Sequence, residues 1–432
     1  MNDWSTQHRL IEQLFSAGLA AVDPRTTVER TLSFDGTWLK IADRTIEVRG
    51  RLVVLAVGKA AGSMALGAID VLGDRIDAGI ALTKDGHFSS PVPGFEYYEA
   101  RHPLPDQRGI DATRKIIELV SDLKAEDVVI ALISGGGSAL LEAPVDGISL
   151  EDLQQTTDLL LKAGAPIHHL NAVRSVLSQV KGGGLRRTIG EASCVSLILS
   201  DVLGSDPQVI ASGPTVNSIA NASLALDELR RYKLLERVPT SVLDELKTLR
   251  IVPTPYSVSK DIWHIIADNR SFLDAIAATA TTLGLKPEVA WRDQEGEARD
   301  VGSRFVRFAN HAQPEFDCLI GGGETTVTVK GPGIGGRNTE FALAAAIELD
   351  GLGIRNWTVA SLASDGDDGS ANAAGAIADP DSVDRGRSLG VSADAHLQDN
   401  DSASYFATVG GLVQTGPTGT NVNDLYIALK SN

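Results

Sequence analysis

Cysteine and long apolar runs are both scarce in this sequence. Only Cys194 and Cys318 occur in 432 residues, each within an apolar stretch, so we interpret them as buried, reduced thiols and not as a disulfide or metal site. The strongest apolar runs, such as residues 128–133, are far shorter than the ~20 residues of a transmembrane helix. The N-terminus lacks a basic segment followed by an apolar core. We therefore expect a cytoplasmic protein without a membrane partner.

Positive charge is also in deficit. The chain has 39 Lys and Arg against 56 Asp and Glu, a net charge of −17, which opposes non-specific binding to nucleic acid. An anionic ligand must then be attracted by a local basic site. Several catalytic patterns are missing too: HExxH, GxSxG and, after the first strand, the dinucleotide fingerprint GxGxxG. Their absence argues against a zinc peptidase, an α/β-hydrolase and an NAD enzyme.

What is present is a long chain in which apolar strand-like runs alternate with amphipathic helical segments. The length favours two domains, and the alternation favours α/β/α layers. Strands are predicted at residues 52–57, 128–133 and 327–330, and helices at residues 107–123, 150–163, 167–180, 271–282, 297–311 and 338–349. We expect a Rossmann-like N-terminal domain with a parallel sheet in residues 1–250 and a smaller C-terminal α/β domain with a mixed sheet in residues 251–432. The first helix, near residues 10–18, could pack on either domain. The linker is predicted at residues 250–260, which contain two prolines and no periodicity.

The 43 glycines gather in short loops. The first, VGKAAG, ends a buried strand and opens a helix, so Gly58 and Lys59 lie where backbone N–H groups and the helix dipole favour an anion. A strand-to-helix turn with a solvent-facing lysine is the alternative.

A second loop, SGGGS, follows the next clear strand. It comprises Ser134, Gly135, Gly136, Gly137 and Ser138, and its bare main chain could approach a phosphate or carboxylate closely. A tight connection would explain the glycines almost as well.

A similar loop recurs in the second half as GGGETT. Gly322, Gly323, Glu324 and Thr325 belong to it. Two such loops facing each other would suit a polyphosphate that bridges a cleft.

The segment GPGIGGRNTE places Arg337 and Asn338 at the first turn of a predicted helix. The positive end of the helix dipole disfavours arginine there unless an anion shares the site. A phosphate or carboxylate contact is therefore expected, with a surface arginine as the alternative. A permanent, bidentate cation is what charge stabilisation in phosphoryl transfer requires.

Two acidic loops, SDVLGSD and SDGDDG, follow strands and supply Asp201 and Asp365 as candidate Mg²⁺ ligands. Mg²⁺ usually takes one or two protein carboxylates and completes its shell with water and phosphate oxygens. An Asx-rich turn would explain DGDDG equally simply.

Polar residues also recur at helical spacing before a further glycine run. Asn171, Arg174 and Lys181 would share one helical face and could bind substrate or phosphate. A solvated helical face is the plain alternative.

Taken in order, eight segments resemble the class II glycerate kinases, which carry a C-terminal MOFRL domain and some of which bear the name hydroxypyruvate reductase. These segments are VGKAAGSMA, HPLPD, SGGGSALL, LNAVRS with KGGGL, LSDVLGSDP with ASGPT, GGGETTVTVKGPGIGGRNTEFAL, SDGDDGSANAAGA and TGPTGTNVNDL. The resemblance implies an active site in a cleft between two domains, with Lys59 and Arg337 as the catalytic residues.

The expected reaction is ATP- and Mg²⁺-dependent phosphorylation of D-glycerate, at the C2 hydroxyl. The partners are then this small molecule and a nucleotide, with no nucleic acid; a homodimer is compatible with the sequence. Two alternatives stay open: an NAD(P)H-dependent hydroxypyruvate reductase, and a sensor that binds a sugar acid without turnover.

Overall fold

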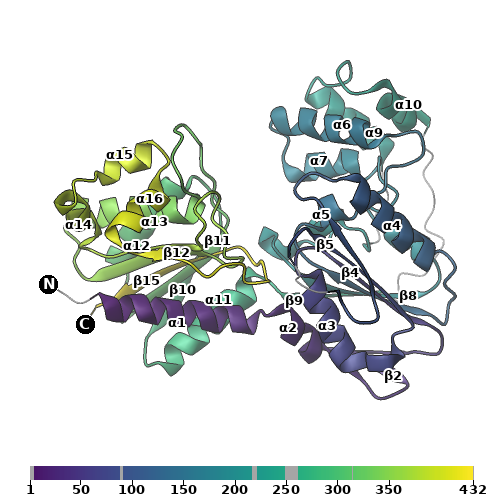
Figure 1. Cartoon of the computed structure of the whole chain (residues 1–432), viewed down its shortest axis with the longest axis horizontal. Coiled ribbons are helices and arrows are strands. Elements are labelled where there is room, and N and C mark those ends of the chain that lie inside the picture. The colour runs from purple at the N-terminus through teal and green to yellow at the C-terminus, as the bar shows by residue number, and fades with distance from the viewer. Residues whose placement is uncertain (1–3, 88–90, 217–220, 249–260, 314, 432) are drawn as a thin grey trace. The chain divides into compact units, whose positions relative to one another are not determined.

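The computed structural model describes residues 4–87, 91–216, 221–248, 261–313 and 315–431 (Figure 1). The chain packs into two compact units. One comprises Pro24–Ile266, and the other combines Met1–Asp23 with Ala267–Asn432. The predicted linker at residues 250–260 lies outside the described residues. No described helix has the length and apolar character that crossing a membrane would need.

The unit Pro24–Ile266 is built on a six-stranded sheet in the order β6-β5-β4-β7-β8-β9. The pairings from β6 to β8 are parallel. Residues of β4, β7 and β8 are buried throughout, as expected for strands covered on both faces. The strands are β4 (Leu52–Val57), β5 (Ala78–Lys84), β6 (Glu96–Ala100), β7 (Val128–Ile133), β8 (Ser193–Leu199) and β9 (Ile262–Ala267).

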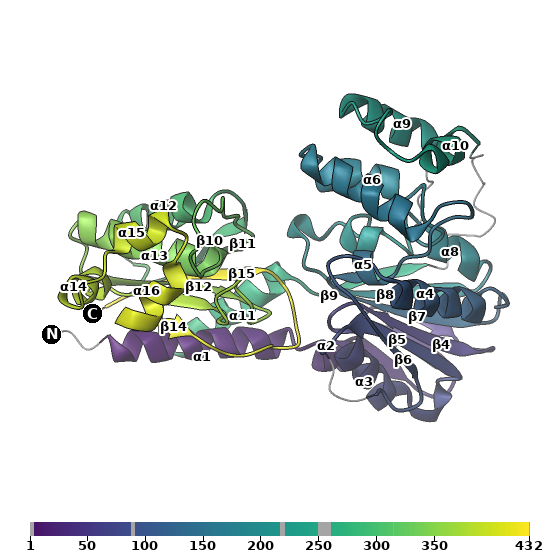
Figure 2. The same ribbon diagram turned by 45° about the horizontal axis from the view of Figure 1, so that its top comes forward.

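Helices cover both faces of this sheet. α3 (Ala61–Leu72) contacts β4 and β5 on one face together with α2 (Pro24–Thr31), while α4 (Gln107–Val120) and α8 (Gly184–Ile189) pack into the core on the other. Four further helices share a separate apolar core and form a layer beyond α5 (Gly137–Leu140) (Figure 2). They are α6 (Leu150–Lys162), α7 (Ile167–Arg174), α9 (Ala222–Arg231) and α10 (Thr240–Thr248).

A small antiparallel sheet precedes β4 and was not predicted. It has the order β1-β2-β3, formed by β1 (Leu32–Phe34), β2 (Trp38–Ile41) and β3 (Arg44–Glu47).

The other unit has a mixed sheet in the order β10-β11-β15-β12-β13-β14. β10 and β11 are parallel, and the remaining pairings are antiparallel. Its strands are β10 (Pro287–Gln294), β11 (Cys318–Gly323), β12 (Trp357–Ala363), β13 (Gly375–Ala378), β14 (Leu412–Val413) and β15 (Asp424–Lys430). The predicted α/β fold with one parallel and one mixed sheet is thus confirmed.

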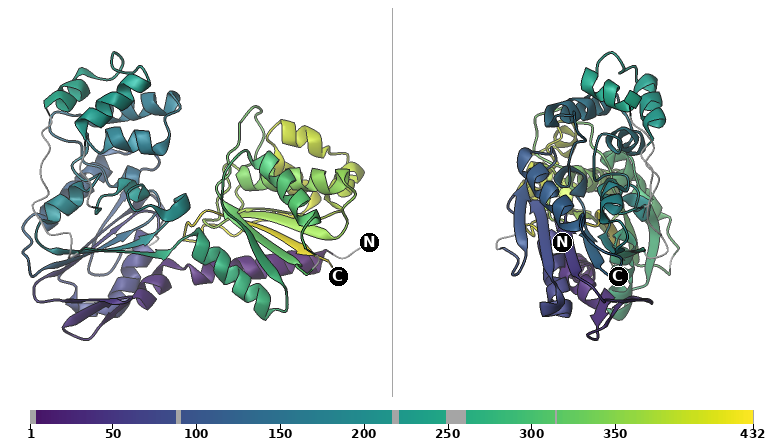
Figure 3. Two further views of the ribbon diagram at one scale, coloured as in Figure 1. Left: turned by 180° about the vertical axis from the view of Figure 1, so that it is seen from behind. Right: turned by 90° about the vertical axis from the view of Figure 1, so that its right-hand side faces the viewer.

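The N-terminal helix belongs to this second unit. α1 (Ser5–Ala21) and α11 (Asn269–Thr282) lie side by side on one face of the mixed sheet (Figure 3). Phe15 meets Phe272 edge-on with ring centres 6.0 Å apart. A Cβ at Gly18 would lie 2.6 Å from the Phe272 ring, so glycine is what allows this close approach. The opposite face carries α12 (Ala298–Asn310), α13 (Arg337–Gly351), α14 (Ser382–Ser388), α15 (Ala393–Gln398) and α16 (Ser402–Val409).

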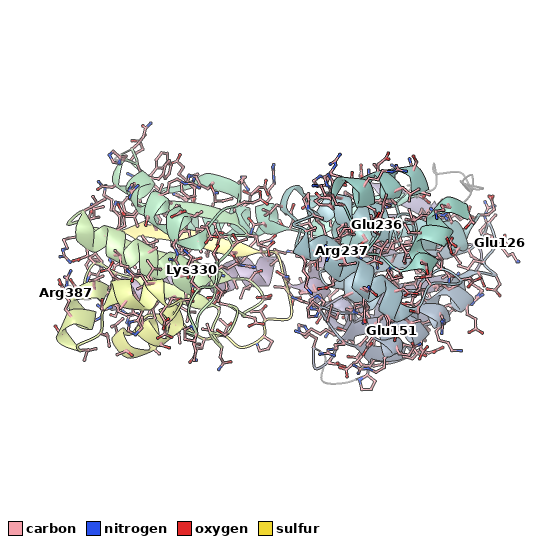
Figure 4. All side chains as sticks on the ribbon, turned by 90° about the horizontal axis from the view of Figure 1, so that it is seen from above. Glu126, Glu151, Glu236, Arg237, Lys330 and Arg387 are labelled. Carbon is pink, nitrogen blue, oxygen red and sulfur yellow. The ribbon has the colours of Figure 1, made fainter. Side chains whose placement is uncertain are left out.

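Charged side chains cover the outside of each unit. Glu126, Glu151, Lys330 and Arg387 are exposed and point away from their own unit (Figure 4). The charged side chains that are instead buried therefore require a specific explanation.

Three predicted elements differ in the structure. Residues 321–323 continue strand β11 instead of forming a loop, and the predicted strand at 327–330 has no strand conformation. The helix expected from residue 167 to 180 ends at Arg174. In the first case, three glycines in succession indicated a loop, but the ladder with β10 and β15 overrides the local preference.

Candidate active site

The turn after β4 is held against the SGGGS loop. Gly58 has a φ of 120°, and a Cβ there would lie 2.3 Å from Ser134 Oγ. The N–H of Lys59 donates to the carbonyl of Gly135 at 2.9 Å, and the N–H of Ala60 donates to Ser134 Oγ at 3.0 Å. Only glycine permits both this backbone conformation and this approach.

These bonds assign Ser134 a role different from the predicted one. Its hydroxyl is 1% exposed; it accepts from Ala60 and donates to the carbonyl of Val57 at 3.4 Å. Ser134 thus joins two turns, and its binding to an anion stays a prediction. The same bonds use the amides of Lys59 and Ala60, so the Lys59 side chain is the group of this turn that could still contact an anion.

The glycines of this loop bring three functional side chains together. A Cβ at Gly135 would lie 2.0 Å from Asp201 Oδ2, and a Cβ at Gly136 would lie 3.3 Å from both His102 Nε2 and Lys59 Cγ. Lys59, His102 and Asp201 therefore surround the loop between β7 and α5. At Gly137 a Cβ would collide with Ala211 at 2.7 Å, which makes that glycine a packing requirement.

His102 was not predicted as a site residue, although its HPLPD segment was noted. Burial lowers the pKa of His102 to about 4, with further lowering by Lys59, Lys84 and His87. The imidazole is therefore neutral near pH 7 and can accept a hydrogen bond. Lys59 and Lys84 supply positive charge at this end of the sheet, in contrast to the chain's overall acidity.

Behind the loop, Ser138 is the centre of a polar network. Its hydroxyl lies 2.9 Å from Ser212 Oγ, and Ser212 donates to Asn171 Oδ1 at 3.1 Å. Its carbonyl accepts from Arg174 at 2.8 Å and from Lys181 at 2.7 Å. The prediction that Asn171, Arg174 and Lys181 share one helical face is wrong for Lys181, because α7 ends at Arg174. The three side chains instead gather around Ser138 and Ser212.

Lys181 is fully buried, and its ammonium group contacts other groups of the protein. Besides Ser138, it donates to the carbonyl of Leu141 at 2.9 Å and pairs with Glu142 at 3.1 Å. Burial lowers its pKa to about 8 against the effect of Glu142. With these three partners Lys181 holds the loop in place, so a direct contact between Lys181 and substrate would have to replace one of them.

In the second unit, two carboxylates hold Arg337. Nε and Nη2 donate to Asp424 at 2.6 and 3.0 Å, and Nη1 donates to Glu324 at 2.9 Å. Burial works to lower the pKa of Arg337, but Asp424 and Glu324 raise it on balance. Three of the five N–H donors are used, and the side chain is 29% exposed, so two donors are left for a ligand.

The anion expected at the start of α13 is the protein's own Asp368. Its carboxylate accepts from the N–H groups of Asn338 and Thr339, at 2.8 Å each, and from Thr339 Oγ1 at 2.8 Å. Asn338 is fully buried and also donates its side-chain amide to Asp368. Asn338 thus binds a buried carboxylate of the DGDDG loop, and its contact with substrate or phosphate stays a prediction.

Gly322 and Gly323 lie in a strand and not in the predicted loop. Both belong to β11, where Gly322 pairs with Leu425 and Gly323 pairs with Asp424. A Cβ at Gly322 would lie 2.2 Å from Asn269 Oδ1, and one at Gly323 would lie 2.1 Å from the carbonyl of Gln294. These glycines serve sheet pairing and packing, and their binding to substrate or phosphate stays a prediction. Of the same segment, Glu324 holds Arg337, and Thr325 is buried.

The two predicted metal ligands lie in different units. Asp201 contacts the SGGGS loop, and Asp365 is half-buried and accepts from the N–H of Asp367 at 3.0 Å. Within the described ranges, no three His, Cys, Asp or Glu side chains cluster as a metal cage would require. A metal here would have to obtain most of its ligands from substrate and water.

The sequence matches two family models. Residues 10–247 match the domain of unknown function DUF4147, and residues 317–424 match the MOFRL family. A D-glycerate 2-kinase of Thermotoga maritima is 42% identical over 388 residues, covering 88% of this chain and 90% of that protein. The chain belongs to the glycerate 2-kinase family.

Other members of the glycerate 2-kinase family extend the match. The glycerate 2-kinase of Pyrococcus horikoshii is 37% identical and covers 96% of both chains. A protein of Agrobacterium vitis with a provisional hydroxypyruvate reductase name is 41% identical over 88% of this chain and 99% of that protein. The crystal structure of a Thermotoga maritima glycerate kinase has a TM-score of 0.89 at 38% identity, covering 99% of this chain and 100% of that chain. The resemblance identified from eight sequence segments is thereby confirmed.

Proposed function

We propose that this protein transfers the γ-phosphoryl group of ATP to the C2 hydroxyl of D-glycerate, giving 2-phosphoglycerate and ADP. The observation that carries the proposal is the arrangement at the ends of β4 and β7, where Lys59, His102 and Asp201 surround one glycine loop. Open parallel sheets bind ligands at this edge. Membership of the glycerate 2-kinase family supports the choice of reaction.

Phosphoryl transfer needs positioning and charge neutralisation more than covalent chemistry. Lys59 supplies a cation at the SGGGS loop, and neutral His102 can accept a hydrogen bond from the acceptor hydroxyl. Arg337 supplies two remaining N–H donors from the second unit. Asp424 and Glu324 offset the positive charge of Arg337. The remaining charge suits a phosphate group that is already partly neutralised by Mg²⁺. A catalytic role for both Lys59 and Arg337 is part of the proposal.

The residues present fit a Mg²⁺ ion held mainly by phosphate. Asp201 fills the space that a side chain at Gly135 would need, so its carboxylate lies beside the predicted phosphate position. Asp201 and Asp365 are the candidate ligands, each in its own unit, and Mg²⁺ usually takes only one or two protein carboxylates. When bound, Mg²⁺ would supply positive charge that offsets the negative charge of the phosphates.

The direct test is a coupled assay for ADP with purified protein. ADP release that requires both D-glycerate and Mg²⁺ supports the proposal, and phosphorus NMR of the product distinguishes C2 from C3 phosphorylation. Oxidation of NADH with hydroxypyruvate, without ADP release, would support a reductase instead. Neither activity, with D-glycerate still bound, would indicate a sensor.

Two accompanying expectations are separate from this assay. The location is proposed to be the cytoplasm, and a homodimer is proposed as an assembly; sedimentation of the purified protein tests the latter.

A further inference from the structure

Two donors behind the SGGGS loop are buried without an acceptor. They are Nδ2 of Asn171 and Nε of Arg174, three residues apart on α7 and hence on one face of the helix. Asn171 is 8% exposed. A buried N–H without a partner costs about 1–3 kcal/mol, more when it is charged, so native proteins rarely keep two together. Both donors are suited to a ligand oxygen.

The charges at this place do not balance either. Arg174 and Lys181 each carry a positive charge, and Glu142 is the carboxylate that acts on both. Lys181 pairs directly with Glu142 at 3.1 Å, whereas Arg174 has no ion pair within the described residues. Burial accordingly lowers the pKa of Arg174. Among these three groups one positive charge is left over, which matches a ligand of charge −1 better than a polyphosphate.

The surrounding backbone is shaped for a close contact. Ala211 and Ser212 both have positive φ, 51° and 62°, a conformation that costs non-glycine residues of order 1–3 kcal/mol each. The turn places Ser212 Oγ between Ser138 Oγ and Asn171 Oδ1. It is further fixed by the N–H of Gly182, which donates to the carbonyl of Ser212 at 2.9 Å. Strain that is held in place by neighbours is typical of a binding site.

We propose that Arg174 and Asn171 bind the carboxylate of the hydroxy acid, while Lys181 and Glu142 act as positioning residues that hold the loop beneath them. The proposal rests on the proposed function, since it assigns one end of that substrate. Arg174 then supplies a charge-assisted bond through Nε, and Asn171 supplies one through Nδ2.

Binding can be tested without turnover. We expect D-glycerate, titrated calorimetrically into the full-length protein without ATP, to bind wild type and Arg114→Gln alike. Arg114 is an exposed arginine of the same unit and serves as the matched control. Arg174→Gln should weaken binding about 10- to 100-fold, the value of one charged hydrogen bond. Asn171→Asp should weaken it at least as much, because the new carboxylate would pair with Arg174 itself.

Two further measurements separate this role from a structural one. Without ligand, Arg174→Gln should keep or raise the melting temperature, because it removes a buried charge that has no ion pair. Glycerol has a neutral CH₂OH in place of the carboxylate. Wild type should bind glycerol far more weakly than D-glycerate, whereas Arg174→Gln should bind the two compounds with about equal, weak affinity. The proposal would be overturned if Arg174→Gln bound D-glycerate with wild-type affinity, or if it kept the wild-type preference for D-glycerate over glycerol.

The result also distinguishes this inference from the proposed function. If wild type binds D-glycerate through Arg174 but releases no ADP, the kinase assignment fails and the carboxylate site stands. If wild type releases ADP in a glycerate-dependent manner and Arg174→Gln leaves the KM for D-glycerate unchanged, the kinase assignment stands and the carboxylate site fails. In a kinase, Arg174→Gln should raise the KM for D-glycerate and leave that for ATP within about twofold.

Discussion

Asp368 provides a decisive test of whether the DGDDG loop serves the fold or a metal. In the structure its carboxylate caps α13 and holds Asn338 and Thr339 next to Arg337. Asp368→Ala removes the cap and leaves two buried N–H groups and one buried hydroxyl without that acceptor. Asp367, in the same loop but exposed, is the matched control.

The expected loss follows from these contacts. A lost side-chain N-cap costs about 0.5–2 kcal/mol, and a buried donor left without a partner costs about 1–3 kcal/mol. Burial raises the pKa of Asp368, so its charge is not fully compensated and part of the loss is offset. Since such terms are not additive, we expect about 2–4 kcal/mol, or roughly 4–16 °C in Tm for a unit of this size.

Differential scanning calorimetry measures the change in Tm, and hydrogen exchange of the first turn of α13 locates it. Asp368→Ala should show faster exchange there, whereas Asp367→Ala should match wild type in both. Kinase activity of Asp368→Ala, measured well below its Tm, should keep the wild-type dependence on Mg²⁺ concentration. An unchanged Tm together with a strongly raised Mg²⁺ requirement would refute the capping role and indicate a metal ligand.

The remaining predictions concern pH and backbone. Burial holds the pKa of His102 at about 4, below its ordinary 6.5, so the unfolded state binds more protons than the folded state between these pH values. The free energy of unfolding should therefore fall as the pH decreases from 6.5 to 4, by on the order of 1 kcal/mol after solvent screening. Urea titrations of His102→Gln should lack this pH dependence. Burial raises the pKa of Asp424 to about 6, so protonation below pH 6 should release Arg337 and lower kcat, while Asp424→Asn should show low activity without that acid limb. Gly58→Ala should lower the free energy of unfolding by about 2–4 kcal/mol in the same urea titrations, because φ is 120° and the added Cβ would meet Ser134. Gly73→Ala controls for the effect of a positive φ alone, since no atom lies within 4 Å of its added Cβ.

Periodicity and apolar runs were enough to predict much of the fold. β4 and β7 were predicted at their observed bounds, and the longer helices α4, α6, α11, α12 and α13 were predicted within a few residues. The small sheet β1-β2-β3 was missed because its strands have three or four residues each, too few to show an alternating pattern.

The candidate site was predicted less evenly. A glycine loop and an acidic loop, each after a buried strand, led to Lys59 and Asp201, because parallel strands end at one edge. The sequence could not show which acceptors are internal: Asp368 and Asp424 reach Asn338 and Arg337 across 30 and 87 residues. Glycine itself was ambiguous, since Gly135 makes room for a carboxylate while Gly322 makes room for strand packing.

The central claim is that Lys59 and Arg337 are both catalytic residues of the phosphoryl transfer, and the kcat of each single alanine variant tests it most directly. Lys59→Ala and Arg337→Ala should each lower kcat about 10²- to 10³-fold, the loss expected when one preorganised cation is removed. Near wild-type turnover in either variant would contradict the account.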